Sequence, residues 1–175
     1  TVPGIVQLDA SAVELVDRTM IDLANENPVF RPAIDKFLKG NPAAILLVEF
    51  SGDEEQPLLE KLTHLHELLR DLNSSVEIID ALDPGFQAEV WEVRKSGLNI
   101  LMAMRGDGKP VSFIEDCAVP LEHLADYTDR LNEEFDRHGV QGTWYAHASV
   151  GTLHVRPVLN MKDPKHAIKM REIAE

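Results

Sequence analysis

The sequence predicts an α+β fold in which helices pack on one face of a mainly antiparallel sheet. Segments typical of strands alternate with segments typical of helices along the 175 residues. Near the C-terminus, two runs rich in β-branched and aromatic residues flank Val150-Gly151, which is the pattern of a β-hairpin. A strand, a long helix and a further strand recur, as in the split βαβ unit of ferredoxin-like folds. We therefore predict a ferredoxin-like domain over residues 1–175.

The first fifty residues contain one clear strand and two short helical segments. Residues 11–16 alternate weakly between apolar and polar and fit either a strand or the start of a helix. Helical patterns follow at residues 17–25 and 32–38, and Asn27-Pro28 separates them. Residues 43–50 form a continuous apolar run bounded by turn residues, which predicts a buried strand.

The middle of the chain begins with an amphipathic helix. Its leucines recur at three- and four-residue steps: Leu58, Leu59, Leu62, Leu65, Leu68, Leu69 and Leu72. Ser51 and Glu54 have the spacing of a capping box ahead of it. We expect residues 73–75 to end this helix and residues 76–81 to form the next strand.

A second helix of the middle region is predicted from its boundaries. Asp83-Pro84 supplies an N-cap followed by proline at the first helical position, and the helical pattern runs to Gly97. Residues 98–105 are apolar and fit either type of element, and residues 105–110 read as a turn. Residues 111–119 predict a strand.

Two helices are expected in the last third of the chain. Pro120 begins the first, and Gly139 ends it at the position after the C-cap. Asp163-Pro164 begins the second, which reaches the C-terminus.

The predicted hairpin carries the clearest functional hint. A two-residue turn at Val150-Gly151 would place His147 opposite His154 and Tyr145 opposite Arg156. One face is then apolar and holds Trp144, Ala146, Ala148, Leu153, Val155 and Pro157. The other face is polar and holds Tyr145, His147, Ser149, Thr152, His154 and Arg156. Opposed residues have Cβ atoms about 4.5–5.5 Å apart, so two imidazoles there could share one ion.

Several polar residues have both a functional and an ordinary interpretation. His147 and His154 could bind Zn²⁺, Mn²⁺ or Fe²⁺, but their spacing alone favours a polar surface or hydrogen-bonded core histidines. Arg156 and Arg94 are candidate carboxylate clamps, although Arg94 by itself would be read as a surface residue of a helix. Glu115-Asp116 could supply a ligand or a hydrogen-bond acceptor, or simply end a strand.

Composition excludes several classes of protein. The chain has 17 Lys and Arg against 30 Asp and Glu, a net charge of −13, which argues against nucleic-acid or anionic-membrane binding. The single cysteine, Cys117, rules out an internal disulfide and an all-cysteine cluster and is compatible with the cytoplasm. There is no initiating methionine, and the last helix has no stop signal, so we expect a fragment of a longer protein, cut at both ends.

Motifs spread over most of the sequence resemble one family. They are Trp91-x-x-Arg94, Phe113-Ile-Glu-Asp116-Cys-Ala-Val-Pro120, His147-x-x-x-Gly151-x-Leu153-His154 and His154-Val-Arg-Pro157. This set resembles the C-terminal domain of the FAD-linked oxidases, the family of D-lactate dehydrogenase, the glycolate oxidase flavoprotein subunit and D-2-hydroxyglutarate dehydrogenase. The likeness is greatest to the large bacterial members, which join an FAD domain, this domain and an iron–sulfur region in one chain.

The resemblance implies a substrate-capping domain over the flavin of an enzyme that oxidises a D-2-hydroxy acid. It implies that His147 and His154 bind a divalent metal, that Arg94 contacts the substrate carboxylate, and that Arg156 binds a second anionic group. The third metal ligand of the family, a glutamate, would lie downstream of this chain. FAD would be held mainly by a domain upstream, and an iron–sulfur cluster would belong only to the full-length protein. We therefore expect this chain alone to be inactive, with neither FAD nor a tightly bound metal.

The turn departs from the family pattern, because Ala146 and Ser149-Val150-Gly151-Thr152 stand where family members usually have glycine and Gly-Asp-Gly-Asn. Two other interpretations therefore stay open. The chain could be a non-catalytic domain that binds a small ligand or a partner, in which the histidines are incidental, or a subunit-interface module that forms a homodimer. A cytoplasmic location is expected, with contact to the inner face of the membrane through an electron acceptor as a further option.

Overall fold

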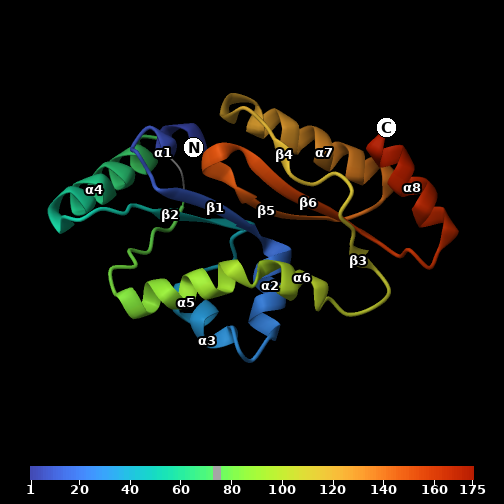
Figure 1. Cartoon of the computed structure of the whole chain (residues 1–175), viewed down its shortest axis with the longest axis horizontal. Coiled ribbons are helices and arrows are strands. Elements are labelled where there is room, and N and C mark those ends of the chain that lie inside the picture. The colour runs from blue at the N-terminus through green and yellow to red at the C-terminus, as the bar shows by residue number, and fades with distance from the viewer. Residues whose placement is uncertain (73–75) are drawn as a thin grey trace.

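The computed structural model describes residues 1–72 and 76–175, and within them it shows an antiparallel sheet surrounded by helices (Figure 1). The strands are β1 (Ala12–Asp17), β2 (Ala44–Glu49), β3 (Lys109–Pro110), β4 (Cys117–Ala118), β5 (Gly142–His147) and β6 (Thr152–Leu159). Their order is β2-β1-β5-β6-β3, and β4 also pairs with β6. Every pairing is antiparallel, which confirms the predicted α+β class and the antiparallel sheet.

Helices of varied length connect these strands. They are α1 (Val2–Val6), α2 (Arg18–Glu26), α3 (Arg31–Phe37), α4 (Glu55–Asp71), α5 (Pro84–Lys95), α6 (Gly97–Met102), α7 (Leu124–His138) and α8 (Pro164–Ala174). Two 3₁₀ turns, η1 (Leu121–His123) and η2 (Ala148–Val150), lie before α7 and inside the hairpin. The apolar segment at residues 98–105 therefore begins as helix α6.

The helices cover both faces of the sheet rather than one. On one face, Val16 and Tyr145 pack with Met20 of α2 and with buried residues of α3, α5 and α6. On the other face, Val155 packs with Phe135 of α7, and α8 adds to the same cluster. In Figure 1 the first group of helices lies below the sheet, and α7 and α8 lie above it. The strands carry apolar side chains on both faces, so each face needs a cover.

The ferredoxin-like arrangement is not confirmed. Strands β1 and β2 are joined through α2 and α3, yet they pair directly as antiparallel neighbours, with Leu15 opposite Leu46. A split βαβ unit would instead bring two parallel strands to either side of a third. The β1–β2 pair is thus antiparallel with a long helical connection, which is not a split βαβ unit.

Two predicted strands are wrong. Residues 76–81 run as an irregular segment, and Val76 and Ile79 are exposed rather than packed in a sheet. Residues 111–119 form a strand only at Cys117–Ala118, because Asp116 has a positive φ of 57° that turns the chain. The predicted helix end at residues 73–75 lies outside the described residues.

Most predicted helix boundaries are confirmed. The Asp83 and Asp163 carboxylates cap α5 and α8 by accepting hydrogen bonds from the backbone amides two or three residues later. Gly139 ends α7 in the left-handed conformation, with φ 60°. The capping box is wrong, because Ser51 bonds to Ser11 at the edge of β1 instead, and α4 begins at Glu55.

The hairpin forms with a different turn and register from those predicted. The connection is the 3₁₀ turn η2 followed by Gly151, so His147 lies opposite Thr152 and Tyr145 lies opposite His154. This register differs from the predicted one by two residues. Because side chains alternate with a period of two, the shift leaves the polar and apolar faces as predicted within the strands.

Candidate functional site

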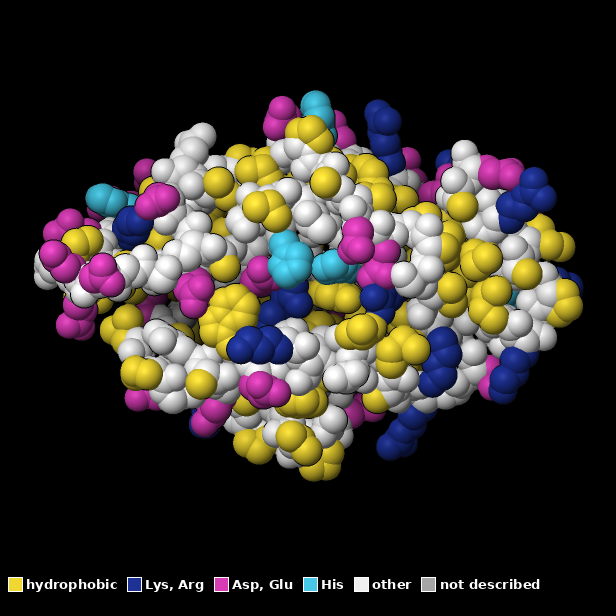
Figure 2. Space-filling view, viewed as in Figure 1, with side chains coloured by type: hydrophobic (Ala, Val, Ile, Leu, Met, Phe, Trp, Pro, Cys, Tyr) yellow, Lys and Arg dark blue, Asp and Glu magenta, His cyan; other side chains and the backbone are white. Residues whose placement is uncertain are grey.

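The two hairpin histidines are diagonal neighbours on the polar face of the sheet. Their ring centroids are 5.2 Å apart, with the edge of one ring toward the other. His147 lies at the end of β5 and is half exposed, whereas His154 lies inside β6 and is mostly covered. Figure 2 shows adjoining histidine side chains near the middle of the side of the molecule that faces the viewer, with acidic and basic side chains beside them.

Glu14 on β1 connects His147 to α5. It lies directly opposite His147 in the sheet, and only 6% of it is exposed. One carboxylate oxygen, Oε1, is 2.9 Å from Nδ1 of His147 and accepts its hydrogen bond. The other, Oε2, accepts a hydrogen bond of 2.5 Å from Arg94. Both oxygens of this buried carboxylate are therefore engaged by site residues.

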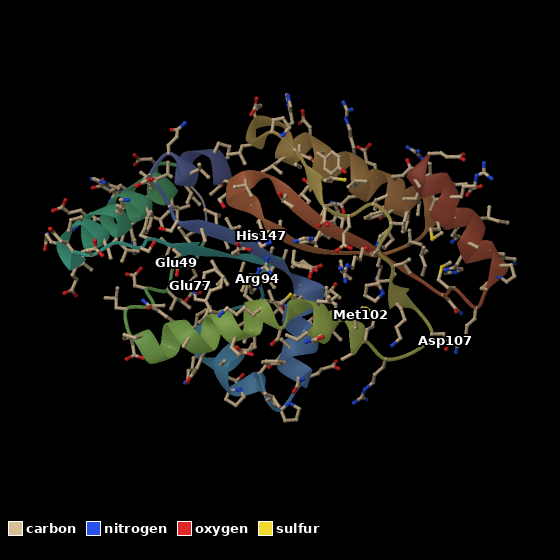
Figure 3. The ribbon with its side chains drawn as sticks, in the orientation of Figure 1. Glu49, Glu77, Arg94, Met102, Asp107 and His147 are labelled. Atoms are coloured by element: carbon tan, nitrogen blue, oxygen red, sulfur yellow. The ribbon has the colours of Figure 1, made fainter. Side chains whose placement is uncertain are left out.

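Arg94 reaches the sheet from the last turn of α5. Its side chain is buried, and its guanidinium lies over the ring of Tyr145 at 5.1 Å from the centroid. The Nε atom of Arg94 has no hydrogen-bond partner among the described residues. Figure 3 shows Arg94 and His147 next to each other at the centre of the molecule. The sequence interpretation of Arg94 as a surface residue of a helix is therefore wrong.

A second set of ion pairs lies around Arg156 and His154. Nε of Arg156 donates a 2.6 Å hydrogen bond to Glu115, and Arg156 also lies 5.8 Å from the Tyr145 centroid. Nδ1 of His154 is 2.7 Å from Oδ1 of Asp116. Glu115, Asp116 and His154 each offer one ligand atom within 4.8 Å of the others, a group that could hold a metal ion.

Burial shifts the pKa of two rings at the centre of the site, in opposite directions. The ring of Tyr145 stacks on that of His154 at 4.6 Å, and both guanidinium groups lie near the same Tyr145 ring. Burial raises the pKa of the Tyr145 phenol, so it stays protonated. Burial also lowers the pKa of His154, against the opposing effect of the Asp116 carboxylate, and the nearby His147 lowers it further. His154 is thus favoured as a neutral imidazole, which is the form that binds metals.

All four residues that the sequence singled out meet at this site. His147, His154 and Arg156 come from the hairpin, and Arg94 comes from α5. The sequence interpretation missed Glu14, whose only signal was an acidic residue inside an otherwise apolar segment at residues 12–16.

Comparison with known families gives a match over the whole chain. The model of the FAD-linked oxidases, C-terminal domain, matches residues 1–175. The chain belongs to this family. Its members are named for oxidases linked to FAD, so the domain is part of a flavoprotein oxidoreductase family.

The relatives compared below are named as dehydrogenases. The chain is 33% identical to D-2-hydroxyglutarate dehydrogenase of Pantoea ananatis over 99% of its length, and equally to that of Escherichia coli. It is 29% identical over 94% of its length to mitochondrial D-lactate dehydrogenase [cytochrome] of Arabidopsis thaliana. The chain spans only 18% of the two bacterial proteins and 26% of the plant protein.

The donor set fits a divalent metal. Both histidines have a carboxylate beside Nδ1, at 2.9 Å for His147 and 2.7 Å for His154. A carboxylate beside Nδ1 is the usual support for a histidine that binds a metal through Nε2. Among the residues that the structure describes, no helix is long and apolar enough to cross a membrane.

Proposed function

We propose that this domain supplies the substrate side of a flavin-dependent dehydrogenase that oxidises a D-2-hydroxy acid. His147 and His154 hold a divalent metal such as Zn²⁺, Mn²⁺ or Fe²⁺, and Arg94 and Arg156 bind carboxylates of the substrate. One observation carries the proposal. Two histidines and one arginine of the sheet meet Arg94 of α5 on one sheet face, each of the four lies beside a carboxylate, and the chain belongs to this family.

The residues of the chain bind and orient the substrate in this proposal. A bound metal would polarise the hydroxyl and carboxylate oxygens of the substrate, and FAD would accept the hydride from its C2 atom. Glu14 and Asp116 lie beside the Nδ1 atoms, so the Nε2 atoms of both histidines are available as metal ligands. The guanidinium of Arg94, with its unpartnered Nε, is suited to fix the C1 carboxylate and thereby the face of C2.

A substrate with two carboxylates agrees best with the charges. Arg94 and Arg156 both lie near Tyr145 and pair with different carboxylates, so one can bind the C1 carboxylate and the other a second anionic group. The bacterial relatives named D-2-hydroxyglutarate dehydrogenase act on such a dicarboxylate. FAD is held mainly by another domain of the parent protein, since the chain corresponds to 18% of those relatives.

The test is to remove each histidine from the full-length protein. His147→Ala and His154→Ala should each lower kcat/KM for a D-2-hydroxy acid by about a hundredfold or more, because the metal loses a ligand. Chelation of the wild type should have a similar effect, and added metal should reverse it. Flavin absorbance reports that the FAD domain stays intact in every case.

His138→Ala is the matched control, because His138 also bonds to a carboxylate, Glu134, but lies on α7 away from the site. It should retain wild-type activity. Wild-type kcat/KM in both site variants, together with no effect of chelation, would contradict the proposal. That result would instead favour a binding domain in which the histidines are incidental.

A further inference from the structure

Glu14 contacts both halves of the proposed site. Its Oε1 accepts from His147, a proposed metal ligand, and its Oε2 accepts from Arg94, a proposed substrate clamp. Glu14 and Arg94 are both more than nine-tenths buried, so water has little access to their hydrogen bonds. Strand β1 fixes the position of Glu14, because it pairs with β2 on one side and β5 on the other.

A carboxylate in this position constrains the imidazole of His147. An ionised carboxylate only accepts hydrogen bonds, so Nδ1 of His147 must carry a proton to make the 2.9 Å contact. In the neutral ring the other nitrogen, Nε2, then has its lone pair available. A histidine without such a partner favours the opposite tautomer, in which Nε2 carries the proton and cannot bind a metal.

We propose that Glu14 is a positioning residue that sets the metal-binding tautomer of His147 and at the same time anchors the guanidinium of Arg94. The inference rests on the proposed function for the roles of His147 and Arg94. It adds that the two halves of the site depend on one side chain, so that metal and substrate binding are both weakened by its loss.

The variant Glu14→Gln separates the role of Glu14 toward His147 from its role toward Arg94, with almost no change in the shape of the side chain. A glutamine side chain has one accepting oxygen and one donating NH₂ group, whereas glutamate accepts on both oxygens. Arg94 can only donate, so it takes the amide oxygen of the new residue. The NH₂ group then faces Nδ1 of His147, which must give up its proton, and the proton moves to Nε2.

The first measurement is the tautomer of His147, read from ¹⁵N chemical shifts at about pH 8, above the usual pKa of histidine. In the wild-type chain we expect Nδ1–H, and in Glu14→Gln we expect Nε2–H. Glu134→Gln is the control, because Glu134 also accepts from one histidine and one arginine, His138 and Arg137, but on α7. It should leave the His147 signals unchanged.

The second measurement is the affinity of the full-length protein for Co²⁺, followed by its absorbance. Glu14→Gln should weaken binding about tenfold to hundredfold, as loss of the partner of a ligating histidine does. It should also raise KM for the hydroxy acid, while Glu134→Gln changes neither. His147→Ala, measured alongside, reports whether that histidine binds the metal at all.

The outcomes separate the two claims. An Nε2–H tautomer of His147 in the wild type would overturn the inference without any variant, even if Glu14→Gln failed to fold. Wild-type Co²⁺ affinity in Glu14→Gln, with affinity lost in His147→Ala, would overturn the inference and leave the proposed function standing. Unchanged affinity in His147→Ala would overturn both.

Discussion

At the scale of single residues, the ring of Tyr145 lies near two guanidinium groups that are each bound to a carboxylate. Arg94 pairs with Glu14, and Arg156 pairs with Glu115. A guanidinium has five N–H donors, so each arginine keeps donors beyond those that its partner uses. Each guanidinium is thus paired with a carboxylate before any substrate binds, and it keeps donors that a carboxylate of the substrate can use.

Arg156→Met tests whether this second cation selects the substrate. In the full-length protein, KM for a dicarboxylic 2-hydroxy acid should rise about tenfold to hundredfold, because a charge-assisted hydrogen bond contributes about 1.5–3 kcal/mol. KM for lactate, which has one carboxylate, should change far less. Arg137→Met on exposed α7 is the control and should alter neither value. An equal rise for both substrates would show that Arg156 does not read the second carboxylate.

At the scale of elements, the hairpin depends on Gly151. Its φ is 70°, and a Cβ atom there would meet the backbone oxygen of Val119 at 1.9 Å. Its own carbonyl oxygen accepts a hydrogen bond of 2.9 Å from the Val119 amide, which ties the end of β4 to the turn. Glycine is required here both for the left-handed backbone and for the close approach of a second segment.

Gly151→Ala should lower the free energy of unfolding by about 2–5 kcal/mol, through left-handed strain and the forced shift of Val119. Gly139→Ala is the matched control, since Gly139 has a φ of 60° but no atom within 4 Å of the added Cβ position. It should lose only about 1–2 kcal/mol. Urea unfolding measures both variants, and equal losses would show that the contact with Val119 contributes nothing.

The hairpin also shows how far sequence patterns reach. Alternation assigned His147, His154 and Arg156 to one face, and a register error of two residues could not alter that result. The predicted two-residue turn is wrong, because the 3₁₀ turn η2 lies between the two strands. The alternation of apolar and polar residues does not reveal such a turn. At residues 76–81 the predicted strand does not form. A strand needs a neighbour to pair with, and the pattern of residues within the segment does not show whether one is available.

At the scale of the whole molecule, the site is assembled from segments far apart in the sequence. Glu14 is 80 residues from Arg94 and 133 residues from His147, and it meets both because β1 lies beside β5 in the sheet. No local motif encodes such a meeting, so Glu14 was missed while the hairpin residues were found. The motifs did predict the family, because each is a short stretch of sequence whose spacing can be read without knowing the fold.

The two layers of helices have separate roles in this arrangement. Helices α2, α3, α5 and α6 cover the polar face beside the site and bring Arg94 into it. Helices α7 and α8 cover the opposite, apolar face of the hairpin and hold it in place. The site therefore lies on the sheet face that α5 borders, and α7 and α8 support the sheet on its opposite face.

The central claim is that His147 and His154 share one metal ion beside Arg94. Anomalous diffraction from crystals of the full-length protein grown with Mn²⁺ or Co²⁺ tests it most directly. We predict one peak about 2.0–2.3 Å from Nε2 of both histidines, and a bound 2-hydroxy acid with its C1 carboxylate at Arg94. A peak remote from both histidines, in crystals of enzyme whose activity requires the metal, would contradict the account.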